Sequence, residues 1–166
     1  MFYRAKQFYK ALVPIISNTE RAWVKDFLPH RAACLFFQQS LVEQRHALDV
    51  AFDIKEQSSF LPAKDLKTLL TAALLHDCGK SIIKIKLWHR IMAVILFKIP
   101  NLLRSKLLNH CVIFSLPMKI ANHHPIWGEK LSKQAGVDKD VQVLIRQHHD
   151  PKTVLGEILY HIDSQH

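Results

Sequence analysis

The fold of this chain is decided by the stretch DLKTLLTAALLHDCGK, residues 65–80. Leucine and alanine recur in it at spacings of three and four, which predicts a helix from Asp65 to about Asp77, stopped by Gly79. The same spacing places His76 and Asp77 at the ends of faces that otherwise carry leucine, alanine and threonine. A core-facing histidine or aspartate has to be paired or bind a metal, because an unpartnered buried charge is very costly. The stretch therefore predicts a core helix with a chemical site at its carboxyl end.

Helical spacing continues outward from this stretch in both directions, and no strand-like alternation persists. Before it, a capping box at Ser17 and Glu20 and the proline Pro29 predict two helix starts, and a further helix is predicted over residues 41–54. After it, we predict helices over residues 87–99, 101–108, 125–135 with Gly136 as its stop, 138–149 and 154–163. The chain shows no repeat, linker or break in composition, so we expect a single all-α structural domain.

The composition bounds the class of protein. The chain has 166 residues, 49% of them hydrophobic, which suffices for one buried core and argues against a disordered chain. Its longest apolar run, residues 91–97, is far shorter than the roughly 20 residues of a membrane-spanning helix. The N-terminal stretch lacks the features of a signal peptide. Three cysteines without a Cys-x-x-Cys pair indicate neither a zinc ribbon nor a disulfide framework, so we expect an intracellular, cytoplasmic protein.

Metal-binding side chains interrupt the apolar stripes of the predicted helices at His46, His76, Asp77, His148 and Asp163. His124 directly precedes Pro125, so we expect it at the start of a helix. One histidine on an apolar face is more often a hydrogen-bonded core residue than a ligand, but packing does not explain so many. Imidazole and carboxylate without thiolate suit Fe, Mn, Co, Ni or catalytic Zn. More than four ligands also allow a two-metal centre bridged by one aspartate.

The run Ala73-Leu74-Leu75-His76-Asp77-Cys78-Gly79-Lys80 resembles the signature of the HD-domain metal-dependent phosphohydrolases of the HDIG type, with Cys78 where that type has isoleucine. Four further blocks occur in the family's order. Residues 44–51 resemble its first-histidine block, and residues 124–128 resemble its His-Pro-x-x-Gly block. Residues 146–150 resemble its His-His-Glu block with aspartate for glutamate, and residues 160–163 resemble its closing Ala-Asp block without the alanine. The resemblance implies a helical HD-domain bundle over residues 41–166, with a metal site between core helices. Helices within residues 1–40 would pack on this core.

The resemblance also implies a ligand set. In the family, the first histidine, the His-Asp doublet and the last aspartate hold one ion, and in binuclear members the doublet's aspartate bridges to a second. The positions that match the first ion are His46, His76, Asp77 and Asp163. Those for the second ion are Asp77, His124 and His148, with His149 as the alternative to His148. The implied cofactor is one or two divalent transition-metal ions.

The resemblance and the chemistry of phosphoester hydrolysis assign further roles to neighbouring residues. The lysine after the doublet contacts the substrate phosphate in the family, and the matching residue here is Lys80. His149 and His123 are candidates to protonate the leaving oxygen. Asp49 and Asp150 are candidates to accept hydrogen bonds from the ligand imidazoles.

The implied activity is hydrolysis of a phosphomonoester or phosphodiester, of a nucleotide or dinucleotide, by water that the metal activates. Relatives that cleave cyclic dinucleotides carry a Gly-Tyr-Pro motif after the double histidine, whereas residues 150–153 here read Asp-Pro-Lys-Thr. A cyclic di-GMP phosphodiesterase is therefore disfavoured. The chain also resembles an uncharacterised subgroup with a Leu-Trp-His-Arg stretch, found here at residues 87–90.

Three other functions compete with this one. A regulatory module would keep the metal site with little turnover, and a di-iron oxygenase would use the same fold for oxidation. The net charge of +9 also fits nucleic-acid binding, but no recognition motif supports it, so nucleic acid is not the expected partner. The charge is concentrated in the basic 80–119 segment, which holds eight basic residues and no acidic one. This segment predicts attraction of a small phosphorylated substrate to the metals, or contact with an anionic membrane surface. The sequence indicates no oligomeric state.

Overall fold

The computed structural model describes residues 14–82, 98–100 and 112–166, and every regular element among them is a helix. The elements are α2 (Asn18–Phe27), α3 (His30–Gln38), α4 (Leu41–Gln57), α5 (Ala63–Leu75), the 3-10 helix η1 (Cys78–Ile82), α8 (Val112–Gln134), α9 (Lys139–Gln147) and α10 (Val154–Asp163). The predicted all-α class is confirmed for this part of the chain. The helices predicted over residues 87–99 and 101–108 lie outside it, apart from the end of the first. No described helix has the length and apolar character needed to cross a membrane.

The capping box predicted at the start of α2 is present. The Ser17 hydroxyl accepts a hydrogen bond from the Glu20 amide at 3.2 Å, and the Ser17 amide donates to the Glu20 carboxylate at 2.7 Å. Arg45 of α4 reaches the same carboxylate at 2.6 Å, which ties α2 to the following helices. α3 in turn packs against α5, η1 and α8, so the described N-terminal helices lie on the core. A division of the chain at residue 40 stays a prediction.

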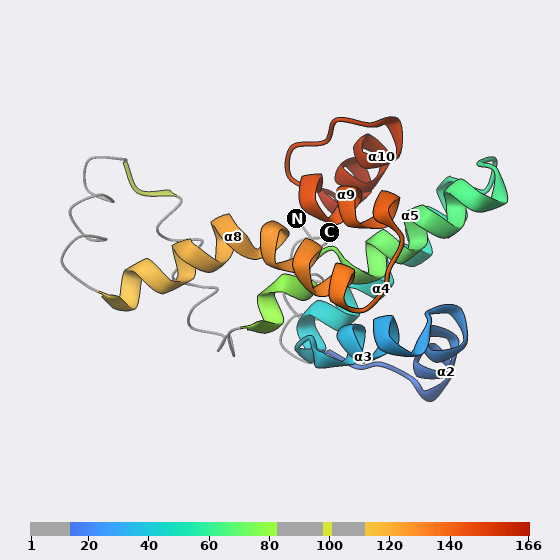
Figure 1. The fold of residues 1–166 in the computed structure, drawn as a ribbon, viewed down its shortest axis with the longest axis horizontal. Coiled ribbons are helices and arrows are strands. Elements are labelled where there is room, and N and C mark those ends of the chain that lie inside the picture. Colours follow the sequence, from blue (N-terminus) through green and yellow to red (C-terminus); the bar gives the residue numbers. More distant parts are fainter. Residues whose placement is uncertain (1–13, 83–97, 101–111) are drawn as a thin grey trace, which may run out of the picture.

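The core forms around the carboxyl half of α5, where residues 69–75 are all buried. A helix that is apolar on all sides belongs in the centre of a protein, because each buried leucine stabilises the fold by about 1.5–3 kcal/mol. α4 lies along one side of α5, and α9 and α10 lie along another (Figure 1). α5 ends at Leu75, so the His-Asp doublet falls at its junction with η1, in the middle of these helices.

The course of α8 corrects one prediction. We expected a helix to begin at Pro125 and His124 to lie at its start, but α8 begins at Val112 and runs through both residues. Proline inside a helix removes one backbone hydrogen bond and costs about 3 kcal/mol. α8 packs against both η1 and α9, and this burial offsets the cost. The helix ends as predicted, since Gly136 has a positive φ of 76° that suits glycine.

Candidate metal centre

The predicted metal ligands come from five α-helices and meet at the end of α5. His46 lies on α4, His76 and Asp77 at the α5–η1 junction, His124 on α8, His148 and His149 just after α9, and Asp163 at the end of α10. Two groups have ligand atoms that all lie within 4.8 Å of one another: His46, His76 and Asp77 form one, and His124, His148 and His149 form the other. Residues far apart in the sequence are therefore brought together.

The Asp77 carboxylate lies between the two groups, and its side chain is only 5% exposed. Its Oδ1 is 3.3 Å from Nε2 of His124 and 3.9 Å from Nε2 of His148. Its Oδ2 is 3.6 Å from Nε2 of His76 and 2.6 Å from Nζ of Lys80. One carboxylate thus presents a different oxygen to each group of imidazoles.

The first group continues to Asp163. Oδ1 of Asp163 lies 2.8 Å from Nε2 of His46 and 3.5 Å from Nε2 of His76. The two imidazole rings meet edge to face with centroids 5.2 Å apart. Asp77, at the α5–η1 junction, and Asp163, at the end of α10, therefore flank the two histidines, and together the four residues offer four donors to an ion.

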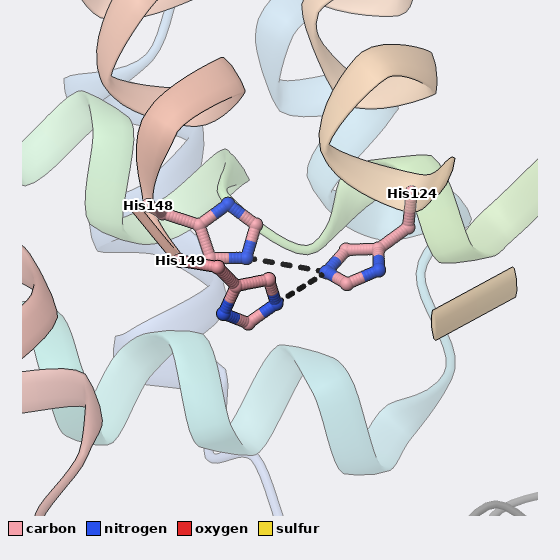
Figure 2. Close-up of side chains that lie close together, drawn as sticks. All are labelled: His124, His148 and His149. Carbon is pink, nitrogen blue, oxygen red and sulfur yellow. Dashed lines mark hydrogen bonds between the residues drawn. The ribbon is translucent and has the colours of Figure 1, made fainter. Parts of the chain in front are cut away.

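The second group consists of three imidazoles (Figure 2). Nε2 of His124 lies 3.2 Å from Nε2 of His148 and 3.1 Å from Nε2 of His149. The sequence left open which member of the double histidine faces the site. The structure brings both of them to His124, from the end of α9.

Backbone carbonyls set the tautomers of the buried histidines. Nδ1 of His76 lies 2.8 Å from the Ala73 carbonyl, Nδ1 of His124 lies 3.1 Å from that of Ile120, and Nδ1 of His148 lies 2.7 Å from that of Ile145. A carbonyl can only accept, so each Nδ1 carries the hydrogen and donates it. The lone pair of each neutral ring is then on Nε2. For these three histidines the acceptors are carbonyls rather than the expected Asp49 or Asp150.

This arrangement fits a bound metal ion. Nε2 of His76 is buried and has no hydrogen-bond partner. His124 and His148 point two Nε2 lone pairs at each other across 3.2 Å, which is unfavourable unless a proton or a cation lies between them. Neutral imidazole nitrogens and carboxylate oxygens are ligands that divalent Fe, Mn, Co, Ni and catalytic Zn accept.

Comparison with known protein families matches the HD-domain model to residues 44–166. The chain belongs to the HD-domain family. No curated protein and no solved structure matches it. The matched span begins two residues before His46 and includes every candidate ligand, so the HD domain and the metal centre coincide.

Burial and neighbouring charges shift the pKa values of the candidate ligands of this HD domain in different directions. Burial alone would lower the pKa of His76, but the carboxylates of Asp77 and Asp163 outweigh it and raise that pKa to about 9. Burial opposes ionisation of Asp77, yet Lys80 and His76 hold its pKa well below its usual range. Burial, and then the charge of His76, lower the pKa of His148. A metal ion would take the place of the proton on His76, because ligands bind in their deprotonated form.

The centre is closed on one side and open on the other. His76, His124 and His148 are at most 2% exposed. The side chains of His46 and Lys80 are each 27% exposed, and His149 is exposed as well. A small molecule would therefore approach the centre of this HD domain across the open side, which we define as His46, Lys80 and His149.

Two glycines allow the doublet to approach α8. A Cβ atom on Gly79 would collide with the carbonyl oxygen of His124 and would lie 2.6 Å from the amide nitrogen of Gly128. A Cβ atom on Gly128 would lie 2.8 Å from Cγ2 of Ile145. The glycines of the His-Asp-x-Gly and His-Pro-x-x-Gly blocks thus let η1, α8 and α9 pack closely enough for Asp77 to reach His124.

Sequence reasoning missed His166. Its Nε2 lies 2.8 Å from Oδ2 of Asp53, and its ring lies 6.2 Å from that of His46. Asp53 follows His46 by seven residues, so both lie on one face of α4, and that spacing was an available signal. His166 itself offered none. Together with His46 and Asp163, this pair holds the end of α10 against α4.

Proposed function

We propose that this HD domain is a metal-dependent phosphohydrolase of the HDIG type that hydrolyses phosphomonoesters or phosphodiesters, with nucleotides or dinucleotides as the substrate class. The observation that supports it best is the Asp77 carboxylate, whose two oxygens face two separate groups of imidazoles. Such a bridge suits a two-metal centre, which stabilises the attacking and leaving oxygens of an in-line displacement.

Each ion has its own donors in this proposal. His46, His76, Asp77 and Asp163 would hold the first ion, and Asp77, His124, His148 and His149 would hold the second. Burial, and then the charge of His124, lower the pKa of His149, so the ring is neutral near pH 7 and suited to bind a metal. We therefore favour His149 as a ligand over His149 as a proton donor.

The bound ions would supply Lewis acidity and lower the pKa of a coordinated water to about 7. Lys80, on the open side, would offset negative charge on the non-bridging phosphate oxygens. His123 is the remaining candidate to protonate the leaving oxygen. Its side chain is exposed and its Nδ1 donates to the Lys119 carbonyl at 2.9 Å, so the proton given to the leaving oxygen would be the one on Nε2 of the doubly protonated ring.

The test is metal analysis of the purified protein, followed by a phosphoester panel of nitrophenyl phosphates, nucleotides and dinucleoside polyphosphates. We expect bound transition metal and turnover that a chelator abolishes and Mn or Fe restores. A protein that stays metal-free and inert after reconstitution would overturn the proposal. Bound metal without turnover would support a regulatory module instead, and oxygen uptake by the iron-loaded protein would support an oxygenase.

We also propose that the basic 80–119 segment attracts the anionic substrate or contacts an anionic membrane surface in the cytoplasm. Charge reversal at Lys84, Lys86 and Arg90 should raise KM for the phosphoester, or release the protein from vesicles that contain phosphatidylserine. Unchanged KM and unchanged vesicle binding would contradict both roles.

A further inference from the structure

Lys80 and the metal centre use the same carboxylate oxygen. Nζ of Lys80 lies 2.6 Å from Oδ2 of Asp77, and the same Oδ2 is the one that faces His76. The lysine reaches it because η1 turns tightly, with the Lys80 amide donating to the Asp77 carbonyl at 2.9 Å. An ammonium and a divalent ion on one oxygen repel each other, and a buried site screens this repulsion less than water does.

Lys80 can leave Asp77 without disturbing the fold. Its side chain is 27% exposed and lies on the open side, whereas its partner is 5% exposed. Its backbone is held by η1, so only side-chain torsions need to change. The lysine would then point its ammonium into the space across which we expect an anion to approach.

We propose that Lys80 is an internal counter-ion that competes with the metal for Asp77, and that metal loading releases its ammonium to the open side for an anionic substrate. The competition concerns metal binding alone, while the last step rests on the proposed function. Loading of the metal and readiness for a phosphate would then be coupled through one side chain.

Calorimetric titration with Mn²⁺ alone tests the competition. Lys80→Met removes the ammonium and should bind Mn²⁺ about tenfold more tightly than the wild type, because the repulsion between two cations on one oxygen is then lost. Lys67→Met is the matched control, because it removes the same charge from the exposed surface of α5 and should leave the affinity unchanged. If Lys80→Met does not fold without metal, Lys80→Gln carries the same test, since its amide can still donate to Asp77.

Chemical labelling tests the release. Limited acetylation with isotope-coded reagent, read by mass spectrometry, should modify Lys80 several-fold faster after Mn²⁺ is added, with Lys67 as the internal reference. Equal or weaker Mn²⁺ affinity in the Lys80 variants, or unchanged labelling of Lys80, would overturn the inference even if the wild type binds metal and turns over phosphoesters. A wild type that binds no metal would overturn this inference and the proposed function together.

Discussion

Asp77 is the residue on which the two halves of the centre depend. Replacing it by alanine removes a carboxylate whose two oxygens face the two groups of imidazoles. We expect Asp77→Ala to lose bound metal and all measurable turnover, as determined by elemental analysis and the phosphoester assay. Asp140→Ala, in the exposed first turn of α9, is the control and should keep both. Wild-type metal stoichiometry in Asp77→Ala would contradict the bridging role.

Cys78 follows Asp77 directly, and its chemistry is set by burial. Its side chain is buried, and burial followed by the charge of Asp77 raises the pKa of the thiol to about 12. The thiolate is the reactive form, so Cys78 should resist iodoacetamide at pH 8 in the folded protein, while the exposed Cys34 reacts. Peptide mapping by mass spectrometry measures both sites, and denaturant should make them equal. Rapid alkylation of Cys78 in the folded protein would show that the α5–η1 junction opens.

Residues of the candidate site differ in how well the sequence predicts their place in it. His46 and His76 were predicted because each breaks an apolar helical stripe, and burying a polar group without a partner is costly. The hydrogen bond between His166 and Asp53 was not predicted, because a contact between residues so far apart in the chain depends on how α10 docks on α4. The participation of both His148 and His149 was also undecided, since adjacent residues near a helix end point in directions that only the backbone settles.

At the scale of elements, the contact of η1 with α8 depends on Gly79. A methyl group there would meet backbone atoms of α8 that cannot move aside. Gly79→Ala should lower the free energy of unfolding in urea by about 3 kcal/mol or more, as overpacking of a rigid contact does, and should weaken metal binding. Gly136→Ala is the control: nothing surrounds its Cβ position, and its positive φ costs only about 1–2 kcal/mol. Equal losses in the two variants would show that the η1–α8 contact is not tight.

Helix boundaries were predicted best where local chemistry sets them. Residues 154–163 were predicted as a helix and form α10, and the capping box of α2 is present, because caps and turns act over a few residues. The predicted start of α8 was wrong, since we took Pro125 as a helix start on local grounds, whereas the helix begins at Val112. Burial of α8 against η1 and α9 outweighs the cost of an internal proline, and that burial is a property of the tertiary structure.

For the whole molecule, the candidate metal centre draws its donors from five helices that also pack against one another. Because its donors come from α4, α5, α8, α9 and α10, a bound ion should stabilise the folded state against the unfolded one. At a free metal concentration of 100 Kd the gain is about 2.7 kcal/mol. We expect a chelator to lower Tm by several degrees in differential scanning fluorimetry, and added Mn²⁺ to restore it. Asp77→Ala should show no response to either; an equal response would place the stabilising ion elsewhere.

The stability of the metal-free protein should depend on pH in a way that the metal reverses. The folded pKa of His76, about 9, exceeds the ordinary value of 6.5, so its contribution is complete below pH 6.5 and is lost as pH rises through 9. The lowered pKa of His148 acts in the opposite sense, with stability lost as pH falls below 6.5. In the presence of a chelator, the free energy of unfolding should therefore be greatest near pH 6.5.

From that maximum it should fall by on the order of 3 kcal/mol by pH 9, as one proton is released from His76. A metal ion on Nε2 of His76 replaces this proton, so the loaded protein releases no proton from His76 as pH rises. Its stability should hold or rise over the same range, because the ion no longer competes with a proton. Urea unfolding at pH 6.5, 7.5 and 9 with and without Mn²⁺ measures both slopes. Parallel slopes would show that the ion does not bind His76, and would move the first ion away from the His-Asp doublet.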